Sequence, residues 1–362
     1  MAISDQTEIE KILRYGDKLY DEGNIDQAKE TYAKVVTLGY VNKDFKTVVD
    51  ACLRLGPIFS RQSDYPNMIK AYENALLVTK TYKLRAKEPT VYKRLGDGYW
   101  RVGAISMAKQ YYDRCEEVLG CIESESEKKY LMASLYIDGY GNLLDEQGRF
   151  REAIKYYKKS LEILDALQPD ARDERSHIYF LYATYNIGVA FERRGMSQER
   201  LGKHSKKWFR EAVKHFEQVR DLCDHTTYEY AISTLDAGYC YSKLSMIPLA
   251  EKYTDEALRI LSKPSINAKD LVAWGHMNRG VIARKKVDFE AAILYFNKAI
   301  ELYDAIGIHE WISMVYSELA ETYRQMGEED KAQEALRRSR DVSKPEKEHV
   351  AVTAVEEGEP AD

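Results

Sequence analysis

A spacing of small and aromatic residues recurs eight times along the 362-residue chain. In the third copy, Tyr92 precedes Leu95 and Gly96, and Ala108 and Tyr112 follow the glycine by 12 and 16 residues. The small residue of this frame stands at Gly16, Gly56, Gly96, Gly141, Gly188, Gly238, Gly280 and Ala320. The first offset is 12 in every copy except the fifth, where it is 24, whereas successive copies lie 40 to 50 residues apart. A constant inner spacing with a variable outer one indicates a repeated structural unit.

Each copy predicts two antiparallel helices, because its apolar residues follow the i, i+3, i+4, i+7 pattern of one helical face. A glycine inside a helix costs about 1 kcal/mol relative to alanine. Its recurrence therefore predicts close approach of the second helix, and a larger residue at Gly96 or Gly238 should overpack by about 1–3 kcal/mol. Seven residues after the small position we expect helix ends with positive φ, at Gly23, Gly103, Gly148, Gly195 and Gly327. One hairpin leaves an apolar face uncovered, so neighbouring hairpins must stack.

The frame resembles the tetratricopeptide repeat, whose pattern is W-x2-L-G-x2-Y followed by A-x3-F. The resemblance covers residues 9–344, with a period of 40 residues or more, as in the long-period repeats of kinesin light chains, cortical spindle-orienting adaptors and bacterial regulators of the Rap type. It implies an all-α fold, an α-α superhelix (solenoid) of about eight hairpins. We expect these near residues 9–40, 49–80, 89–120, 134–167, 181–224, 231–262, 273–306 and 313–344. Residues 345–362 lose the period and predict a flexible acidic tail.

Composition narrows the classes of function. At 44% hydrophobic residues the chain is too apolar for general disorder. Five cysteines without a CxxC pair predict reduced thiols. The sequence has neither a secretory signal nor an uncharged run of about 18 residues, so we expect a cytoplasmic protein that does not engage a membrane. A net charge of −5 argues against non-specific binding of nucleic acid.

Motifs for catalysis are missing from the sequence. It has no G-x-x-x-x-G-K-[ST] phosphate loop, and its close glycine pairs lack the third glycine of a dinucleotide site. His309 and Glu310 are not followed by the second histidine of a zinc-protease helix. We therefore predict no enzymatic activity, no catalytic residue, no cofactor and no metal site.

The fifth copy contains 12 additional residues, around Met196 to Phe209, that are rich in basic side chains next to Trp208. The basic and histidine residues are Arg200, Lys203, His204, Lys206 and Lys207. Such a stretch could contact an acidic partner or a phosphate. Alternatively, both helices of the hairpin simply extend and solvent covers the charges.

Stacked hairpins of this kind curve, and first-helix side chains that are not used in packing line the concave wall. In this frame they lie two residues before the small residue, one after it, and four to five after it. The candidate partner-binding residues at these positions or at their edge are Arg54, Lys93, Arg94, Arg101, Asn142, Asn186, Arg193, Asn278 and Lys285. The basic members favour an acidic partner, and in long-period relatives wall asparagines hold the backbone of an extended peptide. The same side chains could instead be solvated or pair with acidic neighbours such as Asp97.

These observations favour a non-enzymatic scaffold or adaptor that binds a protein segment or peptide in its groove. The alternative is a peptide-sensing regulator resembling the Rap type but lacking an effector domain, because only eight residues precede the first repeat. A third class is an enzyme with its site around His204 to Trp208. The clamp that chaperone-binding relatives use for a C-terminal carboxylate is not present in the first three copies. The sequence leaves the partner and the oligomeric state open.

Overall fold

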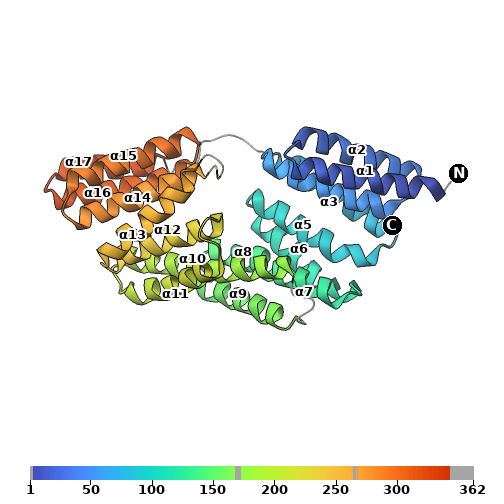
Figure 1. Ribbon diagram of the computed structural model, residues 1–362, viewed down its shortest axis with the longest axis horizontal. Helices are drawn as coiled ribbons and strands as arrows, with labels where there is room; N and C mark the ends of the chain where they lie inside the picture. Colours follow the sequence, from blue (N-terminus) through green and yellow to red (C-terminus); the bar gives the residue numbers. More distant parts are fainter. Residues whose placement is uncertain (1–2, 168–172, 264–265, 267, 343–362) are drawn as a thin grey trace, which may run out of the picture. The chain divides into compact units, whose positions relative to one another are not determined.

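The computed structural model describes residues 3–167, 173–263, 266 and 268–342, and these residues form helices and connections without any strand. The helices pack in consecutive antiparallel pairs (Figure 1), which confirms the all-α solenoid fold. They form two compact units, residues 1–222 (unit 1) and 223–362 (unit 2). The expected acidic tail, residues 345–362, lies outside the described residues. None of the described helices combines the length and the apolarity needed to cross a membrane.

Unit 1 holds hairpins one to five, and unit 2 holds hairpins six to eight. In unit 1 the pairs are α1 (Ile3–Asp21) with α2 (Ile25–Val41), α3 (Phe45–Arg61) with α4 (Tyr65–Thr81), α5 (Glu88–Arg101) with α6 (Ile105–Val118), α7 (Glu125–Ser134), η3 (Leu135–Gly141) and α8 (Asn142–Glu146) with α9 (Phe150–Asp165), and α10 (Glu174–Arg200) with α11 (Lys206–Leu222). Short 3-10 turns, η1 (Arg85–Lys87) and η2 (Leu119–Cys121), flank hairpin three. In unit 2 the pairs are α12 (Tyr228–Lys243) with α13 (Ile247–Leu261), α14 (Lys269–Lys285) with α15 (Phe289–Ala305), and α16 (His309–Gln325) with α17 (Glu329–Val342).

Every hairpin except the fifth closes through a three-residue loop whose middle residue has a positive φ. The expected glycines fill four of these middle positions, at Gly23, Gly103, Gly148 and Gly327. Serine or valine takes the same conformation in the other three, at Ser63, Ser245 and Val287. The residue after it donates its N–H to a carbonyl five residues back, as Asn24 does to Leu19 at 2.8 Å. This bond satisfies a carbonyl that the end of the helix would otherwise leave unpaired.

The recurring glycine lies directly under a side chain of the second helix, which follows it by 16 residues except in hairpin five, where Phe216 follows Gly188 by 28. A Cβ at Gly96 would lie 2.3 Å from Tyr112 Cε1, and a Cβ at Gly280 would lie 2.5 Å from Phe296 Cε1. At Gly238 the neighbour is the smaller Thr254, and its backbone nitrogen comes within 3.1 Å of that Cβ position. These contacts confirm that the small residue permits close approach of the two helices.

Hairpin five has the longest first helix of the described hairpins, and its second helix, α11, begins six residues before the packing position Ala212 instead of three. We expected Gly195 to end its first helix with a positive φ, and this prediction is wrong, because α10 continues to Arg200 and the positive φ occurs at Gly202. Gly195 lies seven residues, about two turns, after Gly188. Its Cβ position is 2.8 Å from Phe209, in the same way that Gly188 faces Phe216 at 2.7 Å. The added length therefore repeats the glycine–aromatic contact one layer further along the hairpin.

The first helix of hairpin four contains a seven-residue π-helical segment, η3, between α7 and α8. A π turn holds one more residue than an α turn and therefore shifts the side chains that follow it. Within η3, the Cβ position of Gly141 lies 2.3 Å from Tyr157 of its own hairpin, while that of Gly139 lies 3.3 Å from Tyr112 of hairpin three. The segment thus lets one helix approach the second helices of two hairpins.

Candidate partner-binding surface

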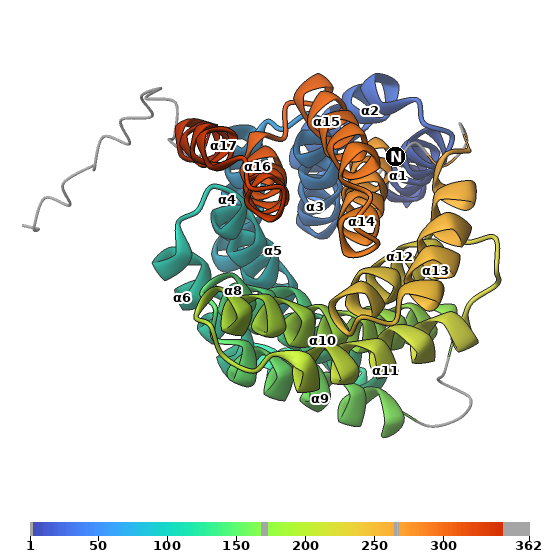
Figure 2. The ribbon, with the colours of Figure 1, turned by 90° about the vertical axis from the view of Figure 1, so that its left-hand side faces the viewer.

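In each unit, first helices of neighbouring hairpins contact one another, for example α1 with α3 in unit 1 and α12 with α14 in unit 2. Figure 2 shows α5, α8 and α10 on the inner side of unit 1, with α6, α9 and α11 behind them. We call the surface formed by the first helices of a unit its inner wall. The predicted binding residues all lie on first helices, seven of them on α3, α5, α8 and α10 and two on α14.

A hydrogen-bonded cluster joins hairpins one and two on the inner wall of unit 1. Asp17, one residue after the small position of α1, accepts a hydrogen bond from Tyr32 Oη at 2.8 Å. Its carboxylate also accepts from Arg54 Nε at 2.6 Å and from Arg54 Nη2 at 3.2 Å. The guanidinium of Arg54 is therefore held in a bidentate ion pair to its own chain.

The same three positions form an uncharged cluster between hairpins four and five. Asn142 Oδ1 accepts from Tyr157 Oη at 2.9 Å and from Asn186 Nδ2 at 3.4 Å. The acceptor Asn142 follows the small residue of its hairpin by one position, and Tyr157 follows that small residue by 16. The donor Asn186 belongs to the next hairpin and lies two residues before the small residue there. We call this arrangement the wall ladder. Asn142 and Asn186 are thus brought together, and Asn142 Nδ2 and Asn186 Oδ1 make no hydrogen bond to another described residue.

Lys93 lies beneath the inner wall and is not on its surface. The residue is 3% exposed, and its ammonium donates to Asp97 at 2.8 Å and to Asp138 at 3.4 Å. Burial opposes the charged form most strongly, but Coulombic attraction to Asp97 and Asp138 outweighs it and raises the pKa of Lys93. The lysine therefore links hairpins three and four from within.

Arg94 is the wall arginine for which the ladder has no acceptor. Its position corresponds to Arg54 and Asn186, but the preceding hairpin has Pro57 where the others have Asp17 and Asn142. Arg94 makes one ion pair, to Asp97 at 3.6 Å in its own helix, and its side chain is 46% exposed. Tyr72 is equivalent to Tyr32, but its phenol donates no hydrogen bond to an acidic side chain of the described residues.

Groups from several hairpins act on the pKa of Arg94. Burial lowers its pKa most strongly, and attraction from Asp97, Tyr72, Tyr179 and Asp138 more than compensates, so that the pKa is raised. These four groups belong to hairpins two, three, four and five. Arg94 therefore keeps a charged guanidinium on the inner wall that is 46% exposed and within electrostatic reach of the neighbouring hairpins.

Of the remaining predicted residues of unit 1, Arg101 lies on α5 with Arg94, and Arg193 lies on α10 of hairpin five. Arg193 is paired with the carboxylate of Asp145. Arg101 is exposed and lies over the ring of Trp100 at 4.9 Å, and the indole nitrogen of Trp100 donates to Glu146 at 2.6 Å. Of the four predicted arginines, Arg94 and Arg101 are therefore the two without a short ion pair.

In unit 2 the two predicted residues lie in different environments. Asn278 is fully buried and donates from Nδ2 to the carbonyl of Leu235 at 3.2 Å, so it joins hairpins six and seven inside the protein. Lys285 is exposed at the end of α14. A stronger charge cluster was not predicted: Glu318 of hairpin eight pairs with Arg284 of hairpin seven and, at 3.6 Å, with Lys243 of hairpin six.

The described residues contain no group of three or more histidine, cysteine or acidic side chains that could hold a metal ion. Burial raises the pKa of Cys52 to about 11 and that of Cys115 to about 12. Both groups are therefore neutral thiols near pH 7 rather than thiolate nucleophiles.

Two parts of the chain match tetratricopeptide repeat family models, residues 138–163 and residues 271–344. No curated protein matches the chain in sequence. Among solved structures, the apo form of the quorum sensor NprR from B. thuringiensis is similar, with 16% identity, a TM-score of 0.67, and coverage of 93% of this chain and 87% of that one.

The apo form of RapI gives 14% identity and a TM-score of 0.61, and the match covers 81% of this chain and 97% of that one. A Rap protein complexed with Competence and Sporulation Factor gives 14% identity and a TM-score of 0.51, over 93% and 97% of the two chains. At these identities the likeness concerns the fold. Together with the family models it confirms that the chain resembles tetratricopeptide repeat proteins.

Proposed function

We propose that the protein is a cytoplasmic, non-enzymatic scaffold whose inner wall in unit 1 binds an extended segment of an acidic protein or peptide. The observation that carries this proposal is the break in the wall ladder at Pro57, which leaves Arg94 46% exposed on the inner wall with one long ion pair. A guanidinium in this state can exchange its contact to Asp97 for a bidentate bond to a partner carboxylate. Arg101 would bind a second acidic group, and the amides of Asn142 and Asn186 would bind the backbone between them.

The similar structures support a partner segment as the ligand. One of them is described as a quorum sensor and another was solved with Competence and Sporulation Factor. This likeness also favours a second candidate function, a peptide-sensing regulator of the Rap type. Sensing requires that the ligand bind two conformations with different affinity. A change in the small-angle scattering profile on peptide binding would favour a sensor, and an unchanged profile would favour a scaffold.

The experiment is capture of acidic segments from a peptide array, followed by affinity measurement on the best binders. We expect Arg94→Glu combined with Arg101→Glu to abolish binding, while the far-UV circular dichroism spectrum stays unchanged. The matched control is Arg114→Glu, because Arg114 is exposed on the second helix α6 and forms only a surface pair with Glu117. Unchanged affinity in the double variant would reject the inner wall as the binding surface.

A separate variant tests the role of the ladder break itself. Pro57→Asp would supply the missing acceptor and engage Arg94 from within, as Asp17 engages Arg54. We expect weaker binding of acidic peptides without the loss of any positive charge. If Pro57→Asp binds as tightly as the natural protein, Arg94 is not the anchor.

A further inference from the structure

A cavity of about 290 Å³ lies between the loop of hairpin four and the end of α10, and none of the predicted binding residues lines it. Its lining residues are Gly148, Arg149, Phe150, Arg151, Glu152, Arg194, Ser197 and Gln198. Ligand pockets usually measure about 300–1,000 Å³, so this one fits a single chemical group better than a large molecule. The lining carries three arginines and one glutamate, a formal charge of +2.

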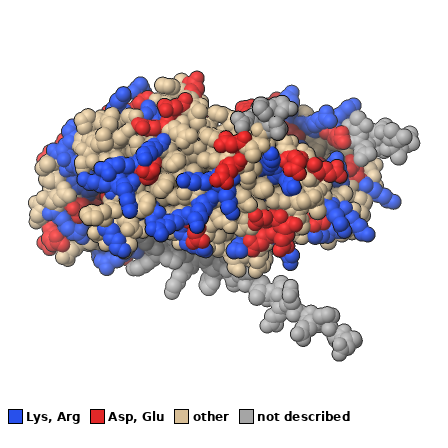
Figure 3. All heavy atoms as spheres, turned by 90° about the horizontal axis from the view of Figure 1, so that it is seen from below, with Lys and Arg blue, Asp and Glu red and all other residues tan. Residues whose placement is uncertain are grey.

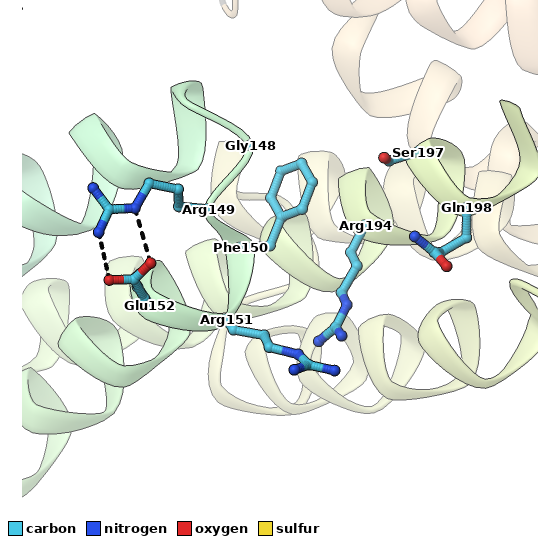
Figure 4. Close-up of a pocket in the computed structure, with 8 residues that line it drawn as sticks. All are labelled: Gly148, Arg149, Phe150, Arg151, Glu152, Arg194, Ser197 and Gln198. Carbon is cyan, nitrogen blue, oxygen red and sulfur yellow. Dashed lines mark hydrogen bonds and ion pairs between the residues drawn. The ribbon is translucent and has the colours of Figure 1, made fainter. Parts of the chain in front are cut away.

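The single acidic side chain of the cavity is already engaged. Glu152 accepts two hydrogen bonds from Arg149, from Nε at 2.8 Å and from Nη2 at 2.6 Å. This bidentate pair leaves the charges of Arg151 and Arg194 uncompensated. In Figure 4 the guanidinium groups of Arg151 and Arg194 point toward each other, whereas Arg149 is turned to Glu152.

Two positive groups face each other here with no carboxylate of the described chain at ion-pair distance from either. The pKa of Arg194 is lowered, first by burial and second by repulsion from Arg151. Such a lowering is uncommon for arginine, whose guanidinium is nearly always charged and paired. The arrangement costs free energy as it stands, and an anion between the two groups would remove that cost.

Aromatic contacts keep Arg194 in position. Its guanidinium lies 3.6 Å from the ring centre of Trp208, which in turn stacks on Phe191 with ring centres 6.2 Å apart. Lys207 also lies over Trp208, at 4.4 Å. A guanidinium that is fixed on an aromatic face loses little conformational entropy when it binds an anion.

The surrounding surface is basic as well. Figure 3 looks at the side on which α9 and α11 lie in Figure 1, and lysine and arginine side chains gather there to the left of centre. Exposed members on these two helices include Lys155, Lys158, Lys206 and Arg210. A patch of one sign attracts anions from solution before they reach the cavity.

We propose that Arg151 and Arg194 form a binding site for an oxyanion, either a phosphate or a carboxylate. Each guanidinium presents two N–H groups in the geometry that bidentate recognition of these anions requires. Gln198 and Ser197, at the rim, would supply uncharged hydrogen bonds. The site gives a role to the basic stretch beside Trp208, and it does not depend on a partner at Arg94.

The test is isothermal titration calorimetry of the full chain with inorganic phosphate, with O-phosphoserine and with acetate, at an ionic strength held constant with sodium chloride. We expect saturable binding of at least one of these anions. Arg151→Gln and Arg194→Gln should each weaken that binding about ten- to hundred-fold, because each removes a charged hydrogen-bonding group. Arg149→Gln, in the same cavity but paired with Glu152, should change it less than about twofold.

The anions distinguish the sources of the ligand. Preference for phosphate and O-phosphoserine would assign the site to a phosphorylated group, and preference for acetate would assign it to a carboxylate. Absence of saturable binding for all three anions would overturn the proposal. Equal affinity in the natural protein and in Arg151→Gln and Arg194→Gln would overturn it too, because the two arginines would then not form the site.

Discussion

At the scale of single residues, the sequence predicts which glycines pack against aromatic rings better than it predicts which charged side chains form ion pairs. The glycine under Tyr112 follows from the repeat alone, because close helix approach leaves no space for a Cβ. The ion pairs of Arg54 and Arg193 do not follow, because their acceptors lie 37 and 48 residues away and depend on the register between hairpins. The non-glycine loop residue Val287 was missed as well, because propensity favours glycine at a positive φ.

The first prediction concerns the glycine under Tyr112. Gly96→Ala should destabilise the protein by about 1–3 kcal/mol, because the new Cβ would overlap the ring. The matched control is Gly120→Ala, where a Cβ would meet nothing within 4 Å and φ is not positive; it should change stability by less than about 0.5 kcal/mol. Urea unfolding midpoints measure both. Equal midpoints for the two variants would contradict the proposed role of Gly96.

The second prediction is a stabilising substitution at Val287. This β-branched residue has φ 65° and is 69% exposed, so its backbone is strained and its side chain packs little. Val287→Gly should raise the free energy of unfolding by about 1 kcal/mol, since the left-handed conformation costs a non-glycine residue about 1–2 kcal/mol. Val41→Gly, at an exposed helical position, should instead destabilise. Thermal unfolding of the two variants should shift in opposite directions.

At the scale of elements, hairpins four and five show where a repeat frame stops being informative. The frame fixes which residues meet, but it does not say whether additional residues form a loop, a π turn or longer helices. In hairpin five the additional residues extend both helices toward the loop between them, because Gly195 and Phe209 can repeat the contact of Gly188 and Phe216. The sequence indicates this extension, because Gly195 follows Gly188 by seven residues and Phe216 follows Phe209 by seven. In hairpin four the sequence indicates the π-helical segment only by two glycines that lie close together, Gly139 and Gly141.

The third prediction tests this extended part of hairpin five. Phe209 is fully buried, and Phe209→Ala should cost about 3–5 kcal/mol if the extension is a packed continuation of the hairpin. Leu201→Ala, at a residue 61% exposed in the loop of the same hairpin, is the control and should be nearly neutral. Guanidinium unfolding followed by circular dichroism measures both. A neutral Phe209→Ala would show that the extension does not contribute to the core.

At the scale of the whole molecule, ion pairs with a buried side chain join neighbouring hairpins. A solenoid is usually stabilised by contacts between nearest neighbours. Within unit 2, however, Glu318 reaches both Arg284 of hairpin seven and Lys243 of hairpin six. Burial works against the charged form of Glu318 most strongly, but attraction to Lys243 and Arg284 prevails and lowers its pKa below the usual 4.5.

The fourth prediction follows from that lowered pKa. Because the folded state holds Glu318 charged to lower pH than the unfolded state, its stabilising contribution is present above about pH 4.5 and is lost as pH falls through the folded pKa. Glu318→Gln should therefore cost about 3 kcal/mol at pH 7, the lower end for breaking a buried ion pair, and the difference should shrink below pH 4.5. The exposed Glu321→Gln, which disturbs only a surface pair with Arg324, should cost less than about 0.5 kcal/mol. Denaturant titrations at several pH values measure the difference, and a pH-independent cost would contradict the prediction.

The wall ladder also bears on how such a chain can change over evolutionary time. The wall ladder consists of matched donors and acceptors. Asp17 pairs with Arg54 between hairpins one and two, and Asn142 pairs with Asn186 between hairpins four and five. Exchanging hairpins would set the carboxylate of Asp17 against an amide, or the amide of Asn142 against a guanidinium, so the two matched pairs favour the present order of the hairpins. Substitutions that create a new binding specificity are then easiest where the ladder contact is absent. Arg94 is at such a position, because Pro57 occupies the place of its acceptor.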